Sequence, residues 1–93
     1  MTKADIVNEV AKATGLEKVT IQTVVETFME TVEESLSKGN NVYLRGFGSF
    51  IVKQRAQKTA RNISEKTSIV IEAHKIPAFK PAKSFVAKVK ELN

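Results

Sequence analysis

Residues 53–68 restrict the fold of this 93-residue chain more than any other segment, because they offer almost nothing to a hydrophobic core. Ile63 is the one large aliphatic side chain in the segment, whereas lysine and arginine recur along it. A polar loop of this length without structure of its own is uncommon inside so small a domain. Strand-like residues flank the segment on both sides. The sequence therefore predicts a long β-ribbon that projects from the body of the protein.

Two helices are expected before the ribbon. Thr2 and Asp5 approximate a capping box at the start of the first helix, and Gly15 is a natural stop for it. Apolar residues recur at helical spacing from about residue 18 to residue 37, which predicts a second helix. Because the connection between them is short, the two helices form a hairpin.

Strand signals appear on both sides of the ribbon. Residues 41–44 and 47–52 have the composition of strands, and a further strand is expected over 68–73. Proline cannot donate a hydrogen bond to a β-ladder, so we expect Pro77 and Pro81 to end the strand pairing there.

A final helix is expected over residues 82–92, with Phe85 on its apolar side. The predicted fold class is α+β: a helical hairpin, a small antiparallel sheet with a long protruding β-ribbon arm, and a short C-terminal helix.

The body that remains without the ribbon is small. Domains of this size bury only roughly 60% of their unfolded surface and are marginal alone, yet five phenylalanines need burial. We therefore expect an obligate dimer. The whole chain, 1–93, is predicted to be one domain, with residues 1–52 and 76–93 as the dimerisation body and residues 53–75 as the β-arm.

Charge is segregated along the chain. Residues 1–44 carry a net charge of −3, whereas residues 45–93 carry +8. Such segregation favours a footprint for nucleic acid or an acidic membrane over general solubility. No apolar run approaches the ~20 residues of a membrane-spanning helix, and the N-terminus lacks the apolar core of a secretion signal. We expect a cytoplasmic protein.

Enzymatic chemistry has little support in the sequence. The chain has no cysteine, and its one histidine, His74, is better explained as a surface or ladder residue than as a catalytic one. A G-x-x-x-x-G-K phosphate loop is absent, and Gly46-x-Gly48 lacks the rest of the dinucleotide fingerprint. No catalytic residue, metal ligand or cofactor is expected. Membrane binding is also disfavoured, because no basic helix carries a strong aromatic face.

Nucleic-acid binding fits the residues best. Basic side chains on an extended ribbon can lie along a groove and neutralise phosphates. Arg61 and Asn62 could hydrogen bond in the minor groove, where the pattern of base edges is degenerate. Ile63 is either a wedge pushed between base pairs or a turn residue that packs locally. The alternative function is a protein-interaction module whose basic arm docks an acidic partner.

Three motifs give the chain a resemblance to the HU/IHF family of bacterial histone-like, DNA-bending proteins. They are Arg45-Gly46-Phe47-Gly48-Ser49-Phe50, the pairs Arg55-Ala56 and Arg61-Asn62, and Pro77-Ala78-Phe79-Lys80-Pro81. The resemblance covers essentially the whole chain. It implies an intertwined dimer whose two β-arms wrap double-stranded DNA through the minor groove, and a nucleoid-associated role in compacting the bacterial chromosome.

The resemblance also implies phosphate contacts from the body and groove contacts from the arm. The residues expected to bind DNA are Lys3, Arg45, Gly46, Gly48, Ser49, Lys53, Arg55, Lys58, Arg61, Asn62, Ile63, Lys66, Lys75, Lys80 and Lys83.

One difference from the family's pattern concerns the wedge, and one feature concerns the branch of the family. Proline usually follows the Arg-Asn pair and intercalates in the family, whereas this chain has Ile63. Arg45 makes the turn similar to the IHF branch, which prefers particular sequences and usually works as a heterodimer. We favour a homodimer similar to HU, with little sequence specificity, because groups that read bases directly are few. The alternative is an IHF-like subunit that bends preferred sequences and pairs with a related chain. If Ile63 is a wedge, unstacking costs less on distorted or nicked DNA, so we expect a preference for such DNA.

Overall fold

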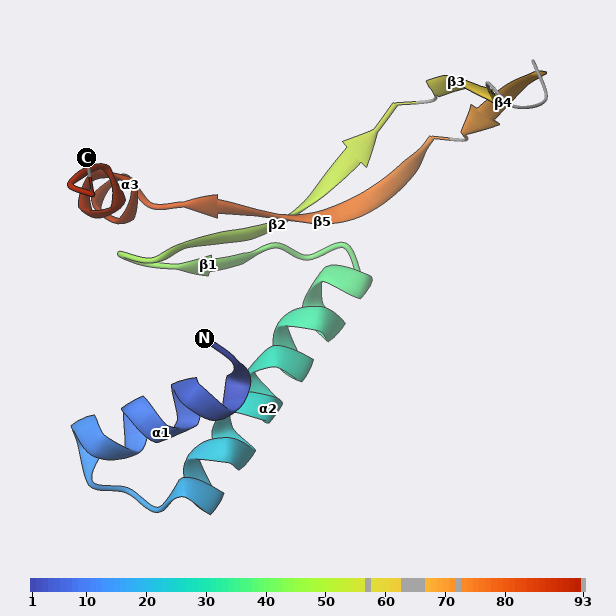
Figure 1. Cartoon of the computed structure of the whole chain (residues 1–93). Helices are drawn as coiled ribbons and strands as arrows, with labels where there is room; N and C mark the ends of the chain where they lie inside the picture. Colours follow the sequence, from blue (N-terminus) through green and yellow to red (C-terminus); the bar gives the residue numbers. More distant parts are fainter. Residues whose placement is uncertain (57, 63–66, 72, 93) are drawn as a thin grey trace. The chain divides into compact units, whose positions relative to one another are not determined.

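The computed structural model describes residues 1–56, 58–62, 67–71 and 73–92, with side chains described for 1–56 and 73–92. These residues form helices and strands in the order α1, α2, β1, β2, β3, β4, β5, α3 (Figure 1). The chain divides into two compact units, Met1–Ser35 and Leu36–Asn93, and each is described by itself. The predicted α+β class and helical hairpin are confirmed.

Helix α1 (Lys3–Thr14) begins and ends where the sequence predicts. The Thr2 hydroxyl accepts a hydrogen bond from the Asp5 amide, and the Asp5 carboxylate accepts bonds from the Thr2 amide and hydroxyl. The hydrogen bond from the Thr2 amide to the Asp5 carboxylate is the main reason that the pKa of Asp5 lies below its ordinary value. The bond from the Thr2 hydroxyl lowers this pKa further. Gly15 has φ 75°, and its amide donates to the carbonyl of Ala11, which closes the helix.

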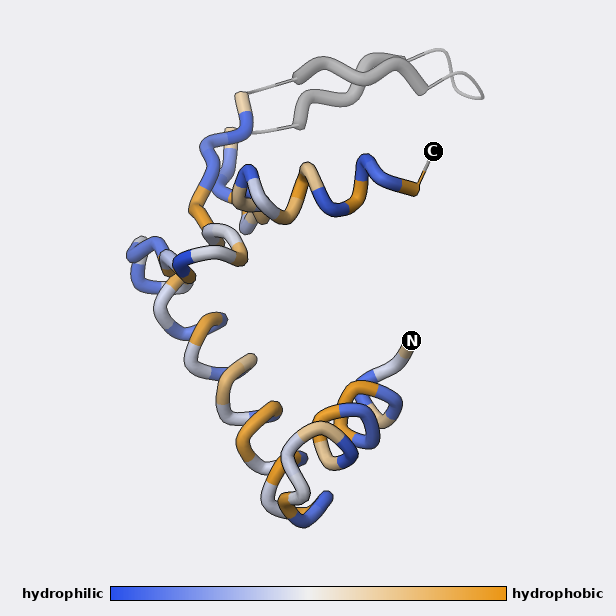
Figure 2. Tube along the Cα trace, turned by 90° about the vertical axis from the view of Figure 1, so that its left-hand side faces the viewer, coloured by the Kyte–Doolittle hydropathy of each residue, from blue (hydrophilic) through white to orange (hydrophobic). Residues whose placement is uncertain are grey.

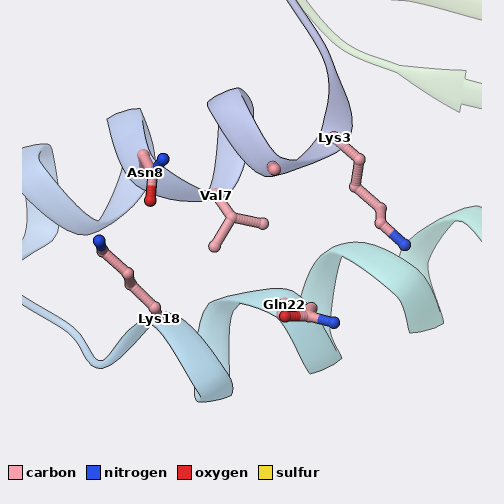
Figure 3. Close-up of a pocket in the computed structure, with 6 residues that line it drawn as sticks. Lys3, Val7, Asn8, Lys18 and Gln22 are labelled. Atoms are coloured by element: carbon pink, nitrogen blue, oxygen red, sulfur yellow. The ribbon is translucent and has the colours of Figure 1, made fainter.

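Helix α2 (Lys18–Ser37) matches its predicted bounds and packs against α1 within the first unit. Val7 of α1 points toward α2 (Figure 3), and Val7, Ile21 and Val32 are buried. Hydrophobic positions recur along both helices, as Figure 2 shows. Other members of the same stripe on α2 stay open to solvent in the single chain: Val24 is 62% exposed and Phe28 45% exposed.

The second unit contains two antiparallel ladders. Strands β1 (Val42–Leu44), β2 (Gly48–Arg55) and β5 (His74–Pro81) form a three-stranded sheet in the order β1-β2-β5. Strands β3 (Lys58–Asn62) and β4 (Thr67–Ile71) form a separate two-stranded ladder. Helix α3 (Lys83–Lys90) follows β5.

The expectation that Pro77 and Pro81 end the pairing is wrong. Strand β5 continues through both prolines, with Pro77 opposite Val52 and Pro81 opposite Gly48. The reason is that, among the residues that the structure describes, β5 is an edge strand and pairs with β2 alone. The two prolines are four residues apart, so their nitrogens point to the same edge of β5, away from the ladder, where no hydrogen bond is lost.

The small core of the first unit makes a direct prediction about stability. Ile21→Ala removes a side chain that is 4% exposed and leaves a cavity between the helices, which lowers the free energy of unfolding by about 2–5 kcal/mol. Val19→Ala on the same helix is the control; Val19 is 75% exposed, and we expect a change within about 0.5 kcal/mol. Urea unfolding followed by circular dichroism measures both. Equal losses would contradict this assignment of the core.

Candidate nucleic-acid interface

The register of β2 against β5 separates the ladder into two faces. Phe50 lies opposite Phe79, and Arg55 lies opposite His74. Side chains of a strand alternate between its faces, so residues two apart share a face. One face therefore carries Phe50, Val52 and Gln54 of β2, together with their partners in β5. The other face carries the residues of β2 that alternate with these three, together with their own partners in β5.

The first face is aromatic where the sheet meets α3. The ring centroids of Phe50 and Phe79 are 4.9 Å apart, and those of Phe47 and Phe79 are 5.2 Å apart. Phe85 of α3 joins the cluster, with its centroid 5.4 Å from that of Phe47. These tilted contacts are favourable for aromatic rings. They attach α3 to the sheet and hold two of the sequence motifs together.

Gly48 is required by this packing. A Cβ atom at this position would lie 2.6 Å from Cζ of Phe79 and 2.7 Å from the carbonyl oxygen of Lys80. Both distances are shorter than Cβ contacts in real proteins, and one partner is backbone that cannot turn aside. The glycine thus lets the ring of Phe79 lie directly against the backbone of β2.

A tight turn precedes β2 and is tied to the start of α3. Gly46 has φ 83°, and the Phe47 amide donates to the Leu44 carbonyl at 3.0 Å. The Ala82 amide donates to the carbonyl of Phe47 at 2.9 Å. The exposed Arg45 in the turn and the exposed Lys83, the first residue of α3, are therefore held on neighbouring segments.

The second face of the ladder is basic. Lys53 and Arg55 of β2 share this face with Lys80 of β5, which lies opposite Ser49. All three cations are exposed, whereas Ser49 is half-buried. Lys75 is opposite Gln54 and belongs to the aromatic face. Lys75 therefore lies on the opposite face of the ladder from the three cations Lys53, Arg55 and Lys80.

Lys3 lies in the first unit, and its amino group is 3.6 Å from a carboxylate oxygen of Glu26. A hydrogen bond from Gln22 at 2.9 Å, followed by the charge of Lys3, holds the pKa of Glu26 below its ordinary value. Lys3 reaches from α1 toward α2 at one end of a pocket between the two helices (Figure 3). The pocket is lined by Lys3, Ala4, Val7, Asn8, Lys18 and Gln22.

The arm is described in its backbone. Lys58 pairs with Ile71, Arg61 with Ser68, and Asn62 with Thr67, so an antiparallel ribbon exists in the segment where the sequence predicts one. Ile63 and Lys66 lie outside the described residues.

Sequence reasoning missed His74 as a member of the basic face. His74 is the first residue of β5 and lies directly opposite Arg55. Its exposed side chain therefore belongs to the same face as Lys53 and Arg55. The signal that could have found it is the pairing register, which fixes the facing residues but is not readable from a strand pattern alone.

Among the described residues, no helix has the length and apolar character needed to cross a membrane.

Comparison with known proteins agrees with this geometry. A family model described as "Bacterial DNA-binding protein" matches residues 1–90. The chain is 44% identical to the DNA-binding protein HU of Thermus thermophilus, over 98% of this chain and 94% of the relative. It is 39% identical to HU of Thermotoga maritima, over 97% of this chain and all of the relative.

Solved structures give the same result. An Anabaena HU–DNA cocrystal structure has a TM-score of 0.91 and 35% identity, covering 96% of this chain and 97% of that chain. HU from Thermotoga maritima has a TM-score of 0.70 and 31% identity, covering 96% and 98%. With a matching family model, relatives of nearly equal length and the paired Gly48 and Phe79 motifs, the chain belongs to the family of bacterial DNA-binding proteins that includes HU.

Proposed function

We propose that this protein is an architectural protein that binds double-stranded DNA, bends it through the minor groove with little sequence specificity, and so compacts the bacterial chromosome. The observation that carries the proposal is the basic face of the β2–β5 ladder, where Lys53, Arg55 and Lys80 are all exposed. Three exposed cations on one side of the ladder can neutralise DNA phosphates. Membership of the family supports the same partner.

Binding begins with phosphate neutralisation. Lys53 and Arg55 lead from the body into the arm, whose expected contacts continue with Lys58, Arg61 and Lys66. At the other end of the ladder, Lys83 stands in the first turn of α3, which holds no acidic residue. A cation at the positive end of a helix is unfavourable. A DNA phosphate there would complement both the lysine and the helix, with Arg45 and the backbone of Gly46 nearby.

Bending requires a wedge as well as cations. Asn62 and Ile63 follow Arg61 in the sequence at the expected turn of the arm. Isoleucine is one of the apolar side chains that partly unstack base steps and kink the duplex. Since unstacking costs less where a duplex is already nicked or distorted, the protein prefers such DNA.

Two copies complete the binding unit. Large apolar side chains remain exposed on both units of the single chain, including Val24, Phe28, Val89 and Leu92. A second copy is the occupant that buries them, and a dimer also supplies two arms. In this assembly residues 1–52 and 76–93 form the body and residues 53–75 the arm. We place the dimer on the nucleoid, in the cytoplasm.

A salt series tests the function. Fluorescence anisotropy measures the affinity for three unrelated duplexes from low to moderate salt. We expect similar affinities and a logarithm of the association constant that falls linearly with the logarithm of salt, by about 0.9 for each phosphate contact. A strong preference for one duplex would favour an IHF-like subunit, in keeping with Arg45. Absence of binding to every duplex would favour a basic-arm protein-interaction module.

Self-association is the first prediction of this proposal. Sedimentation equilibrium at micromolar concentration should give about twice the chain mass of 10.3 kDa. Phe28→Asp places a charge on the exposed apolar face of α2 and should shift the protein toward smaller or unfolded species. Lys12→Asp on the polar side of α1 is the control and should stay dimeric. A folded wild-type species near 10 kDa would contradict the dimer.

The second prediction separates the two faces of the ladder. Arg55→Ala should weaken binding to all duplexes alike and reduce the salt slope by roughly one unit for each arm. Lys75→Ala removes the same charge from the opposite face and should change the slope less. The same salt series measures both variants, and equal changes would show that the face does not decide contact.

The third prediction concerns Ile63. Ile63→Ala shortens the wedge and keeps every charge, so the affinity for intact duplex should change little, because phosphate contacts dominate it. The bend should decrease, as read by energy transfer between fluorophores on the ends of a short duplex at saturating protein. Thr59→Ala, also in the arm, is the control. An unchanged bend with Ile63→Ala would identify Ile63 as a turn residue.

A further inference from the structure

Tyr43 is an aromatic residue that lies outside the phenylalanine cluster. It is the middle residue of β1, which lies beside β2 on the side away from β5 (Figure 1). Its side chain is 71% exposed, whereas its neighbours Val42 and Leu44 are half-buried. Both the ring and the hydroxyl of Tyr43 are therefore accessible to a partner.

The pairing register places Tyr43 on the basic face of the sheet. Tyr43 lies opposite Ser49 of β2, and Ser49 lies opposite Lys80 of β5. Residues directly opposite each other in antiparallel strands point to the same face. Alternation along β2 adds Lys53 and Arg55 to this face. Tyr43 therefore belongs to the same surface as the three cations that are proposed to meet DNA.

Asn41 holds the hydroxyl of Tyr43 in a defined orientation. The backbone amide of Val52 donates to Oδ1 of Asn41 at 2.9 Å, and Nδ2 of Asn41 donates to the hydroxyl oxygen of Tyr43 at 3.1 Å. The first bond fixes which end of the Asn41 side chain faces Tyr43, because a backbone amide needs an oxygen as its acceptor. The hydroxyl oxygen is thus an acceptor here, and this bond leaves its own hydrogen to be donated to another group.

We propose that Tyr43 is a DNA-contacting residue whose hydroxyl, oriented by Asn41, donates a hydrogen bond to a backbone phosphate. Tyrosine hydroxyls are among the groups that bind phosphate oxygens in protein–DNA complexes. The inference rests on the proposed function, because it needs DNA on the basic face. It goes further by assigning two residues outside the expected binding set, Tyr43 as a contact and Asn41 as its positioning residue.

The contact widens the basic face by one strand. The three cations of this face lie on β2 and β5, and Tyr43 is the residue by which β1 contributes to it. Neighbouring strands lie about 4.8 Å apart, so the backbones of Tyr43 and Lys80 are separated by about 10 Å. Phosphate oxygens are acceptors, so a hydroxyl at this edge binds them without adding charge.

Loss of an uncharged donor has a signature of its own. Tyr43→Phe keeps the ring and removes the hydroxyl alone. We expect binding to duplex DNA to weaken by about two- to threefold for each copy of the chain, as for an exposed hydrogen bond. The salt slope should not change, because it counts phosphates neutralised by cations. The urea midpoint should not change either, since the side chain is exposed.

Fluorescence anisotropy with one duplex at several salt concentrations measures these effects. Gln54→Leu is the matched control, because it also removes a neutral hydrogen-bonding group from an exposed residue, but on the opposite face. Its affinity should stay at the wild-type value. Wild-type affinity in Tyr43→Phe would overturn the contact. A reduced salt slope in Tyr43→Phe would also overturn it, because the loss would then come from a displaced cation.

A double-mutant cycle tests the positioning role of Asn41. Asn41→Ala should weaken DNA binding when Tyr43 is present and have no further effect in Tyr43→Phe. If Asn41 acted only through its bond to the Val52 amide, its removal would weaken binding equally in both backgrounds. That result would overturn the positioning role.

Fluorine NMR supplies a readout at the residue itself. The sequence contains one tyrosine, so incorporation of 3-fluorotyrosine labels position 43 alone. Its resonance should move when duplex DNA is added. An unmoved resonance under conditions where anisotropy reports full binding would overturn the role of Tyr43 and leave the proposed function intact. Failure of the wild type to bind the duplex at any salt concentration would overturn the proposed function and this inference together.

Discussion

The contact between Gly48 and Phe79 is the constraint on which the second unit depends. The ring of Phe79 lies so close to the backbone of β2 that a Cβ atom on residue 48 would meet it at 2.6 Å. This approach sets Phe79 opposite Phe50, and the rest of the β2–β5 register follows from that pair. Phe47 and Phe85 then pack around the same ring and fix α3.

The same register positions the charges. Once aromatic rings occupy one face of the ladder, strand alternation sends Lys53, Arg55 and Lys80 to the other. The aromatic cluster on one face of the ladder therefore determines that these cations lie on the opposite face. A shift of one residue in the pairing of β5 with β2 would move every side chain of the shifted strand to the other face and place lysines among the phenylalanines. The same contacts therefore specify both the fold and the candidate interface.

Much of this fold could be predicted because its signals are local. The capping box at Thr2, the stop at Gly15 and the helical spacing of α2 each depend on residues close in sequence, and all three are confirmed. The prolines of β5 were different. Whether proline is compatible with a strand depends on which edge of the strand its nitrogen faces. For Pro77 and Pro81 this is decided by the partner strand β2, whose paired residues Val52 and Gly48 lie far back in the sequence, and not by the prolines themselves.

The candidate site could be predicted in composition but not in geometry. The excess of lysine and arginine after residue 44 is visible in the sequence. The separation of Lys75 from Lys53 and Arg55, and the placement of His74 beside them, arise from long-range pairing. The alternation of side chains along one strand does not give the pairing register between two strands. Without that register, the face of β5 that lies beside the basic residues of β2 cannot be identified.

Site-directed cross-linking tests the central claim, that one face of the β2–β5 ladder meets DNA, most directly. The chain has no cysteine, so a single cysteine can carry a photoreactive group without interference. Gln54→Cys and Arg55→Cys place that group on adjacent residues whose side chains point to opposite faces. The account predicts strong cross-linking to duplex DNA from position 55 and weak cross-linking from position 54 at equal occupancy. Equal yields, or a higher yield from position 54, would contradict it.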